Sequence, residues 1–365
     1  MISKKFIYLL FLTLSIILLQ QNISFAKNGV KNKNNYVNKN LDQVATTLLD
    51  INLISTTFYN NGIGDISPLG TAGLFYPQGS GKTACFTSGL LWGGQIAGDQ
   101  YPRVGGTAYR TGLQPGAILA NGTADDPTLA KYRIYRVRPD VNPKSVADLT
   151  AEAKNENTSV AALTAQYLLD WNEWPAALGA PYTDVNGDGV YDPKVDIPGV
   201  PGANQTVWFI ANDMDASQST YLYGALPIGI ELQATYWAYN QTGALGSMYF
   251  RKFRLVNKGS QHNTVNNMYV SMWADVDLGD AGDDFVGVDT VLSLQYCYNA
   301  QAVDAVYAPL PPPVTGFDFF QGPLVKGVAG QDLNKNGVDD ALDYGIFNGK
   351  KVGPGLINQI GRAHV

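Results

Sequence analysis

The sequence predicts a mainly β protein, an antiparallel β-sandwich of Ig-like or jelly-roll-like topology with a short helical insertion. Short apolar and aromatic runs are separated by Gly, Pro and Asn, which is typical of strands and turns. Lys252 and Arg254 alternate with Phe253 and Leu255, as expected of a strand with one face in water. The 365 residues are enough for one large β domain or two smaller ones.

Residues 1–26 have the pattern of a secretory signal peptide. Lys4 and Lys5 precede an apolar run over residues 6–19, and small residues at 24 and 26 suit cleavage. The alternative is a membrane anchor, but a span needs about 20 apolar residues. We therefore expect a secreted or cell-surface protein with no transmembrane segment after cleavage. Residues 27–45, rich in Lys and Asn at their start, are predicted to form a disordered linker.

The next two regions differ in their expected structure. Residues 46–140 are predicted to be a Gly-rich β region, with apolar runs such as 73–76, 90–92 and 132–137. Residues 141–183 are predicted to hold two short helices and a connector. Ser145 would cap the first helix with Asp148 as its partner, and the polar segment 154–158 would separate the two helices.

Residues 184–325 are predicted to contain an acidic loop followed by the sandwich. Five runs have strand character, at 207–210, 230–239, 248–256, 267–273 and 291–298. Residues 326–359 hold a second acidic loop. The last six residues, 360–365, match the translation of a common sequencing adapter, so we expect them to be an artefact and the gene to continue.

The charge and composition exclude several classes of function. The net charge of −6 and the absence of a basic cluster argue against nucleic-acid binding. The chain has two histidines, His262 and His364, and two cysteines, Cys85 and Cys297, which excludes a structural zinc site. A Ser-His-Asp or Cys-His mechanism would depend on one of these two histidines, and neither has a supporting motif. The 31 acidic residues comprise 27 Asp and 4 Glu, and many of the Asp gather in three clusters.

The first cluster has the spacing of a calcium-binding loop. Side-chain oxygens fall at positions 1, 3, 5 and 9, Gly189 falls at position 6, and a backbone carbonyl falls at position 7. The predicted ligands are Asp184, Asn186, Asp188, Val190 and Asp192. Position 12 is Val195, so Asp196 or a more distant residue has to supply the closing carboxylate. The alternative is a metal-free loop of Asx turns.

The second and third clusters are further candidates for Ca²⁺. The second repeats the loop spacing and ends in a carboxylate at position 12; its predicted ligands are Asp332, Asn334, Asn336, Val338, Asp340 and Asp343. The third places six Asp within residues 275–289, which repel one another unless a cation lies among them. Asp275 and Asp277 would share one face of a strand and bind one ion. A solvated acidic loop is the alternative.

Other features leave alternatives open. Residues 79–83 resemble a nucleotide-binding loop but lack its first glycine, so we interpret them as a turn. Cys85 and Cys297 form either a disulfide or two buried thiols. Trp208, Trp237 and Trp273 are either core residues or part of a sugar-stacking face.

Residues 170–210, with Trp174, Pro175 and the stretches 179–182 and 205–209, and residues 273–290 resemble one group of proteins. These are large secreted and surface proteins that end in a type IX secretion sorting domain. The resemblance implies a class of exported cargo rather than an activity. The sorting domain itself is not in this sequence. The loop at Asp184 also resembles the calcium repeats of dockerins and thrombospondin type 3 modules, without the acid at position 12.

We therefore expect an exported, calcium-stabilised protein with a structural, adhesive or ligand-binding role, whose partners are extracellular polysaccharide or other cell-surface components. The alternatives are a carbohydrate-active enzyme that uses paired carboxylates, with Glu173 and Glu231 as main candidates beside Asp275 and Asp277, and a non-catalytic carbohydrate-binding module.

Overall fold

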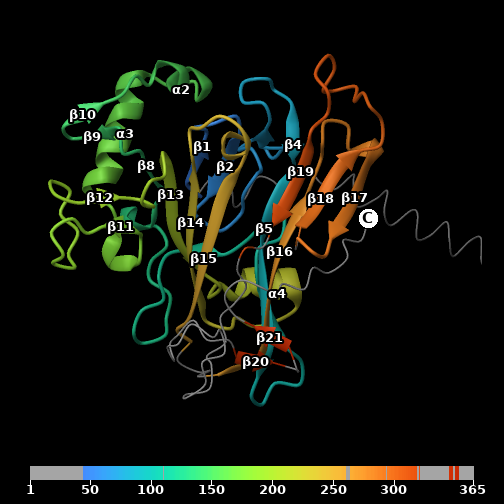
Figure 1. Ribbon diagram of the computed structural model, residues 1–365. Helices are drawn as coiled ribbons and strands as arrows, with labels where there is room; N and C mark the ends of the chain where they lie inside the picture. The colour runs from blue at the N-terminus through green and yellow to red at the C-terminus, as the bar shows by residue number, and fades with distance from the viewer. Residues whose placement is uncertain are drawn as a thin grey trace, which may run out of the picture. The chain divides into compact units, whose positions relative to one another are not determined.

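The computed structural model describes residues 44–109, 111–259, 264–292, 294–318, 320, 345–347 and 350–352 (Figure 1). The predicted signal peptide, most of the predicted linker, both histidines and the second predicted calcium loop lie outside the described residues. The described chain is mainly β, and every strand pair in it is antiparallel, which confirms the predicted class.

One sheet is built around a central strand that is buried on both faces. All eight residues of β13 are buried, as expected of its continuous apolar run Val207–Ile210. The order is β15–β14–β13–β7, and β8 also pairs with β13. The strands are β7 (Gln114–Pro115), β8 (Tyr135–Val137), β13 (Gln205–Asn212), β14 (Ile230–Ala238) and β15 (Tyr249–Asn257).

The facing strands come from both the early and the late parts of the chain. β16 (Val265–Asp275) pairs with β5 (Thr87–Ile96), which pairs with β6 (Arg103–Gly106). A four-stranded meander precedes them and contains β1 (Thr46–Leu49), β2 (Ser55–Tyr59), β3 (Leu74–Phe75) and β4 (Thr83–Cys85). Isolated bridges at Gly64 connect β2 to β5. The regions predicted over 46–140 and 184–325 thus share sheets.

The largest core lies between these two sets of strands. Alternate residues of β14, such as Leu232, Ala234 and Tyr236, are buried against Phe58, Leu90 and Trp92 of the opposite set. A second core covers the other face of β13, where Trp208 packs with Tyr135 and Trp174. β13 therefore connects the main core to the helical region.

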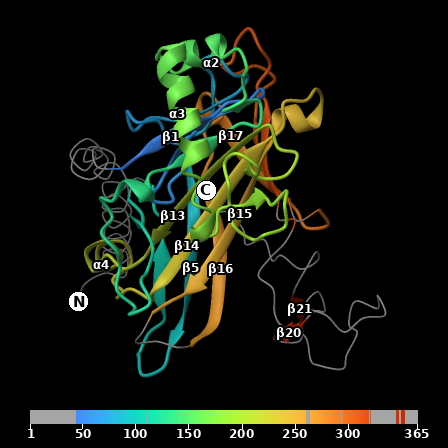
Figure 2. The ribbon, with the colours of Figure 1, turned by 90° about the vertical axis from the view of Figure 1, so that its left-hand side faces the viewer.

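The helical region contains two helices with a break between them, as predicted. They are α2 (Thr150–Asn155) and α3 (Val160–Asn172), and α3 packs beside β8 (Figures 1 and 2). Ser159 begins α3 by accepting a hydrogen bond from the Ala162 N–H. The predicted cap at Ser145 is wrong, because Ser145 lies in a short strand, β10 (Ser145–Val146), which pairs with β9 (Val141–Asn142). Asp148 accepts the Thr150 N–H instead.

Shorter elements complete the described chain. Small sheets are formed by β9 (Val141–Asn142) with β10 (Ser145–Val146), β11 (Tyr182–Thr183) with β12 (Ile197–Pro198), β17 (Asp284–Asp289) with β18 (Leu294–Asn299) and β19 (Val314–Asp318), and β20 (Gly345–Phe347) with β21 (Lys350–Val352). The remaining helices are α4 (Ala216–Tyr223), η1 (Ala130–Tyr132), η2 (Ala176–Leu178), η3 (Ala244–Ser247) and η4 (Ala281–Asp283). β11 and β12 bracket the first acidic loop, and β16 leads into the third cluster.

Candidate metal sites

The first predicted calcium loop runs between β11 and β12. The two carboxylate oxygens of Asp184 accept the N–H groups of Gly187 and Gly189, at 2.7 and 2.8 Å. Gly189 has φ of +76°, the left-handed backbone that position 6 of such a loop requires. Asp188 and Asn186 also accept N–H groups within the loop. The loop is therefore a set of Asx turns with an exposed tip, and its oxygens bond to the loop's own backbone.

Asp196 closes this loop at its base. Its side chain is buried, and its two oxygens accept the N–H groups of Val185 and Asp192, at 2.9 and 2.8 Å. The sequence analysis named Asp196 as a substitute for the missing position-12 carboxylate. In the structure its carboxylate bonds to backbone on both sides of the loop, which fixes the distance between the loop's two ends.

A different group of carboxylates converges most closely in the described part of the chain. Oxygens of Asp50, Glu152 and Glu156 lie within 4.8 Å of one another. The guanidinium of Arg136 already lies among them, with its Nη1 at 2.5 Å from Glu156 Oε1 and 3.6 Å from Glu152 Oε1. Arg138 binds the other oxygen of Glu152 at 2.5 Å. Because two guanidinium groups lie among these three carboxylates, the cluster forms a buried ion-pair network.

The third predicted cluster surrounds a pocket. Asp275 and Asp277, at and just beyond the end of β16, line a cavity of about 220 Å³ together with Asp284 at the start of β17. Gln295, Tyr296 and Cys297 of β18 also line it. None of the described residues that line the cavity is basic. The structure thus brings together the predicted pair, Asp275 and Asp277, and adds a third carboxylate that the spacing did not single out.

One carboxylate oxygen of Asp284, among the residues that line this pocket, is buried without a hydrogen-bond partner. Its Oδ2 accepts the Leu278 N–H at 2.9 Å, whereas its Oδ1 is buried with no hydrogen-bond partner. Burial raises the pKa of Asp284, and the negative charges of Asp283, Asp304 and Asp280 raise it further. A buried oxygen without a partner, among like charges, is stabilised either by a proton or by a cation.

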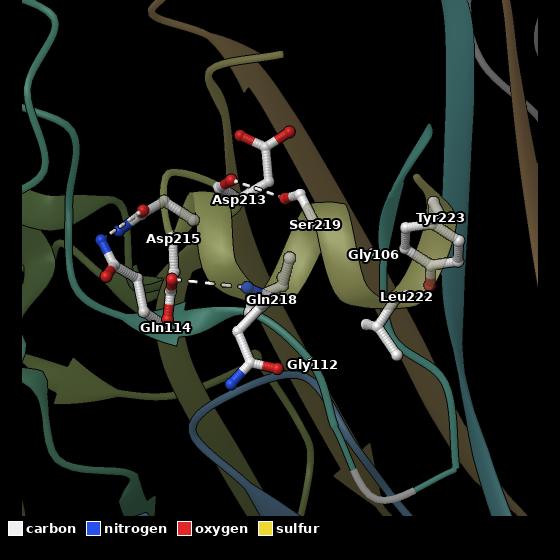
Figure 3. Close-up of a pocket in the computed structure, with 11 residues that line it drawn as sticks. Gly106, Gly112, Gln114, Asp213, Asp215, Gln218, Ser219, Leu222 and Tyr223 are labelled. Carbon is white, nitrogen blue, oxygen red and sulfur yellow. Dashed lines mark hydrogen bonds between the residues drawn. The ribbon is translucent and has the colours of Figure 1, made fainter. Parts of the chain in front are cut away.

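Two further acidic residues, Asp213 and Asp215, have structural roles (Figure 3). Asp213 accepts the N–H groups of Gly229 and Ile230 through Oδ1, which fixes the turn before β14. Asp215 caps α4 by accepting the N–H groups of Ser217 and Gln218. The cleft that both line holds only about 10 Å³, the space of a single water molecule.

The two glutamates of the enzyme alternative belong to separate networks. Glu231 is fully buried, and its oxygens accept from the Ile118 N–H, Lys258 and Gln233, at 2.9, 2.7 and 3.0 Å. Glu173 is exposed and pairs with Arg133 at 2.9 Å. With its oxygens already hydrogen-bonded and no exposure to solvent, Glu231 is suited to holding β14 in place and not to proton transfer.

The remaining candidates are mostly core residues. Trp208 is completely buried, and Trp273 donates to the Thr107 carbonyl at 3.0 Å. Trp237 stacks on Phe250, which stacks on Phe320, and Phe320 is 66% exposed; Trp273 is half-buried and its ring lies 5.5 Å from that of Tyr109, which is 52% exposed. Cys85 and Cys297 are free thiols, both buried in the same core cluster.

The ion-pair network around Arg136 was not predicted from the sequence. A signal existed: Arg136 and Arg138 alternate with the buried Tyr135 and Val137 in an otherwise apolar strand, and buried guanidinium groups require buried carboxylates. The sequence does not show which carboxylates these are, because Asp50 and Glu152 lie far from β8 along the chain.

Among the described residues no helix is both long and apolar enough to cross a bilayer. Comparisons with protein-family models, with curated proteins and with solved structures returned no match.

Proposed function

We propose that this chain is an exported, calcium-stabilised extracellular or cell-surface protein with an adhesive or ligand-binding role. The observation that carries the calcium proposal is that Asp275, Asp277 and Asp284 line one pocket with no basic residue among its described lining residues, and that Oδ1 of Asp284 is buried without a hydrogen-bond partner. The leader-like residues 1–26 and the resemblance to type IX secretion cargo support export.

The lining residues match the preferences of Ca²⁺. Calcium takes six to eight oxygen ligands and accepts carboxylates in irregular geometry. Asp275, Asp277 and Asp284 would hold the ion, which would give Asp284 Oδ1 the partner it lacks and offset the repulsion among the carboxylates. The pocket is large enough for several water ligands as well.

The loop at Asp184 is the second proposed site. Asp184 is half-buried at the start of the loop, Asn186 and Asp188 lie at its exposed tip, and the carbonyl of Val190 and the carboxylate of Asp192 follow in the chain. The hydrogen bonds to Gly187 and Gly189 hold the two oxygens of Asp184 on the inside of the turn. Asp196 keeps the base of the loop closed whether or not an ion is bound.

Calcium at the pocket would tie the end of β16 to the β17–β18 hairpin. An ion that binds only the folded state adds stability by mass action, and the millimolar calcium of extracellular fluids suits sites of modest affinity. The proposed binding role follows from this: rigid loops at a sheet end can present a surface to polysaccharide or to other cell-surface components.

Thermal unfolding of the wild type and of Asp284→Asn, each with calcium and with EDTA, tests the calcium proposal. The asparagine retains an acceptor for the Leu278 N–H but removes one negative charge. We expect calcium to raise the melting temperature of the wild type more than that of the variant. In EDTA the variant should be at least as stable as the wild type, because like-charge repulsion is lower.

Asp289→Asn is the matched control. It removes the same charge from the same acidic segment, but Asp289 caps the turn at Val291 and Leu292 and does not line the pocket. Its response to calcium should equal that of the wild type. A wild-type melting temperature that is the same in calcium and in EDTA would contradict the proposal.

A further inference from the structure

Asn186 is followed by a glycine at the exposed tip of the loop between β11 and β12. An asparagine can lose its side-chain amide when the backbone nitrogen of the next residue attacks the side-chain carbonyl carbon and closes a cyclic imide. Glycine favours this attack, because it has no Cβ to hinder the approach and its backbone is the most adaptable. Gly187 has φ of +73°, in the left-handed region that glycine adopts readily. The sequence and exposure of this pair therefore permit deamidation.

The hydrogen bonds of the loop surround the atoms that would react. The Gly187 N–H, on the attacking nitrogen, donates to Asp184 Oδ1 at 2.7 Å. Asn186 Oδ1, which gains negative charge during the attack, accepts the Asp188 N–H at 3.3 Å. Asn186 Nδ2, which leaves, donates to Asp188 Oδ2 at 2.8 Å. The loop thus supplies a base for the nucleophile, a donor for the developing oxyanion and an anchor for the leaving amide.

Two other Asn–Gly pairs in the described part of the chain are surrounded differently. Asn121 is also exposed, but the Gly122 N–H donates to a backbone carbonyl at 2.9 Å. Asn61 is buried, and the Gly62 N–H donates to a backbone carbonyl at 3.1 Å. A carbonyl oxygen is a much weaker base than a carboxylate. Asn121 therefore serves as an internal reference, with the same dipeptide and similar exposure but no carboxylate on the attacking nitrogen.

We propose that Asn186 deamidates in the folded protein, with Asp184 as the base that accepts the Gly187 proton. The bond that forms joins Gly187 N to Asn186 Cγ, and the bond that breaks joins Cγ to Nδ2. Water at the exposed tip protonates Nδ2, ammonia leaves, and Asp184 gives its proton to the hydroxide that remains. A second water molecule then hydrolyses the imide. Opening at the side-chain carbonyl gives aspartate, and opening at the backbone carbonyl gives isoaspartate.

The reaction would change the charge of the loop. Aspartate at residue 186 places carboxylates at positions 1, 3 and 5, and the charge of the ligands tunes the calcium affinity of such loops. Isoaspartate instead lengthens the backbone by a methylene group and shifts the positions that follow. This consequence rests on the proposed calcium function, whereas the deamidation itself does not.

Peptide mapping by mass spectrometry tests the proposal on the full chain, incubated at neutral pH in EDTA. Asn186 should deamidate at least about tenfold faster than Asn121, because a positioned base assists the attack. In urea the two rates should become similar, since the hydrogen bonds of the folded loop are lost. Asp184→Asn keeps an acceptor for the Gly187 N–H but has no basic carboxylate, so it should slow deamidation of Asn186 at least about tenfold.

Two controls separate this effect from a general loss of charge or of folding. Asp148→Asn makes the same change in net charge at an exposed position before α2 and should leave the rate at Asn186 unchanged. The rate at Asn121 should be the same in the wild type and in both variants. Thermal unfolding of each variant checks that it is folded.

Three results would overturn the proposal: equal rates at Asn186 and Asn121 in the folded chain, an unchanged rate in Asp184→Asn, or a faster rate at Asn186 that persists in urea. Added calcium separates it from the proposed function, because an ion bound by Asp184 and Asn186 should slow the reaction. Deamidation that calcium does not slow would contradict calcium binding at this loop alone. Calcium binding without deamidation would contradict the present proposal alone.

Discussion

The guanidinium of Arg251 lies 2.6 Å from the carboxylate of Asp65; the Asp65 side chain is fully buried and that of Arg251 is 10% exposed. Arg251 is in β15, whereas Asp65 is in the loop after β2, so this ion pair joins the two sides of the main core. Thr56, Ser88 and Tyr249 also donate to Asp65 through their hydroxyl groups. Asp65 has φ of +62°, a backbone region that Asp and Asn tolerate better than most residues.

Asp65→Ala should therefore be among the most destabilising single substitutions. It leaves the largely buried Arg251 without its carboxylate and three hydroxyl groups without their acceptor, and we expect a loss of about 3–5 kcal/mol of unfolding free energy. Asp65→Asn keeps one acceptor and the backbone preference, so its loss should be smaller. Urea denaturation of both variants measures the difference; equal losses would contradict the role assigned to the carboxylate.

Asp50 predicts a pH dependence of stability. Burial raises its pKa from 3.8 to about 7, Glu152 and Glu156 raise it, and Arg136 and the hydrogen bond from Gln205 lower it. Because the folded-state pKa is above the unfolded value, this contribution to stability is complete below about pH 4 and is lost as pH rises through 7. Asp50 Oδ2 has no hydrogen-bond partner, consistent with a bound proton.

Asp50→Asn should remove this pH dependence, because the amide is neutral at every pH. Between pH 4 and 8 the wild type should lose on the order of 1–3 kcal/mol more than the variant. Urea unfolding at intervals across this range measures the two slopes. Parallel curves would show that Asp50 has the same pKa in the folded and unfolded states.

The loop at Asp184 should separate ion binding from loop closure. Asp184→Ala with Asp188→Ala removes two proposed ligands of this loop, and should reduce bound calcium by at least one ion per chain with a smaller change in calcium-free stability. Isothermal titration calorimetry gives the number of ions bound. Unchanged stoichiometry would mean that the loop is a metal-free set of Asx turns.

Asp196→Ala should instead destabilise the protein with or without calcium. It removes the acceptor of the Val185 and Asp192 N–H groups at a buried site, a loss of about 1–3 kcal/mol. Unfolding in EDTA measures this loss. A cost that appears only when calcium is present would assign Asp196 to the ion rather than to the backbone.

The cysteines should be unreactive in the folded protein. Burial raises the pKa of Cys297 to about 12 and that of Cys85 well above its usual range, and acidic neighbours raise both further. Since the thiolate is the nucleophile, a thiol reagent should label the native chain very slowly. Two thiols should react after denaturation without a reductant; fewer would indicate a disulfide.

The strands with local signals were predicted well. The runs at 207–210, 230–239, 248–256 and 267–273 correspond to β13, β14, β15 and β16, because apolar content and alternation are properties of neighbouring residues. The run at 291–298 was placed too early. Asp289 caps a turn at Val291 and Leu292, and β18 begins only at Leu294.

The sites were predicted less completely than the strands. The spacing at Asp184 and the short separation of Asp275 and Asp277 along the chain are local features. In the structure Asp184 lies in the loop between β11 and β12, and Asp275 and Asp277 line one pocket. Asp284 lines the same pocket as Asp275 and Asp277, and this depends on how the chain turns between β16 and β17. The network of Asp50, Glu152 and Arg136 joins a loop, a helix and a strand. No local sequence pattern predicts contacts between residues in separate elements.

By itself the sequence determined the mainly β class, the two helices with their break and the positions of the acidic loops, because periodicity and turn chemistry act over a few residues. The tertiary structure decided which charges are buried together and which carboxylate lacks a partner. Those outcomes depend on contacts between residues distant in the chain: Asp65 meets Arg251, and Glu231 meets Ile118 and Lys258. Their free energy arises from burial, which exists only once the sheets have packed.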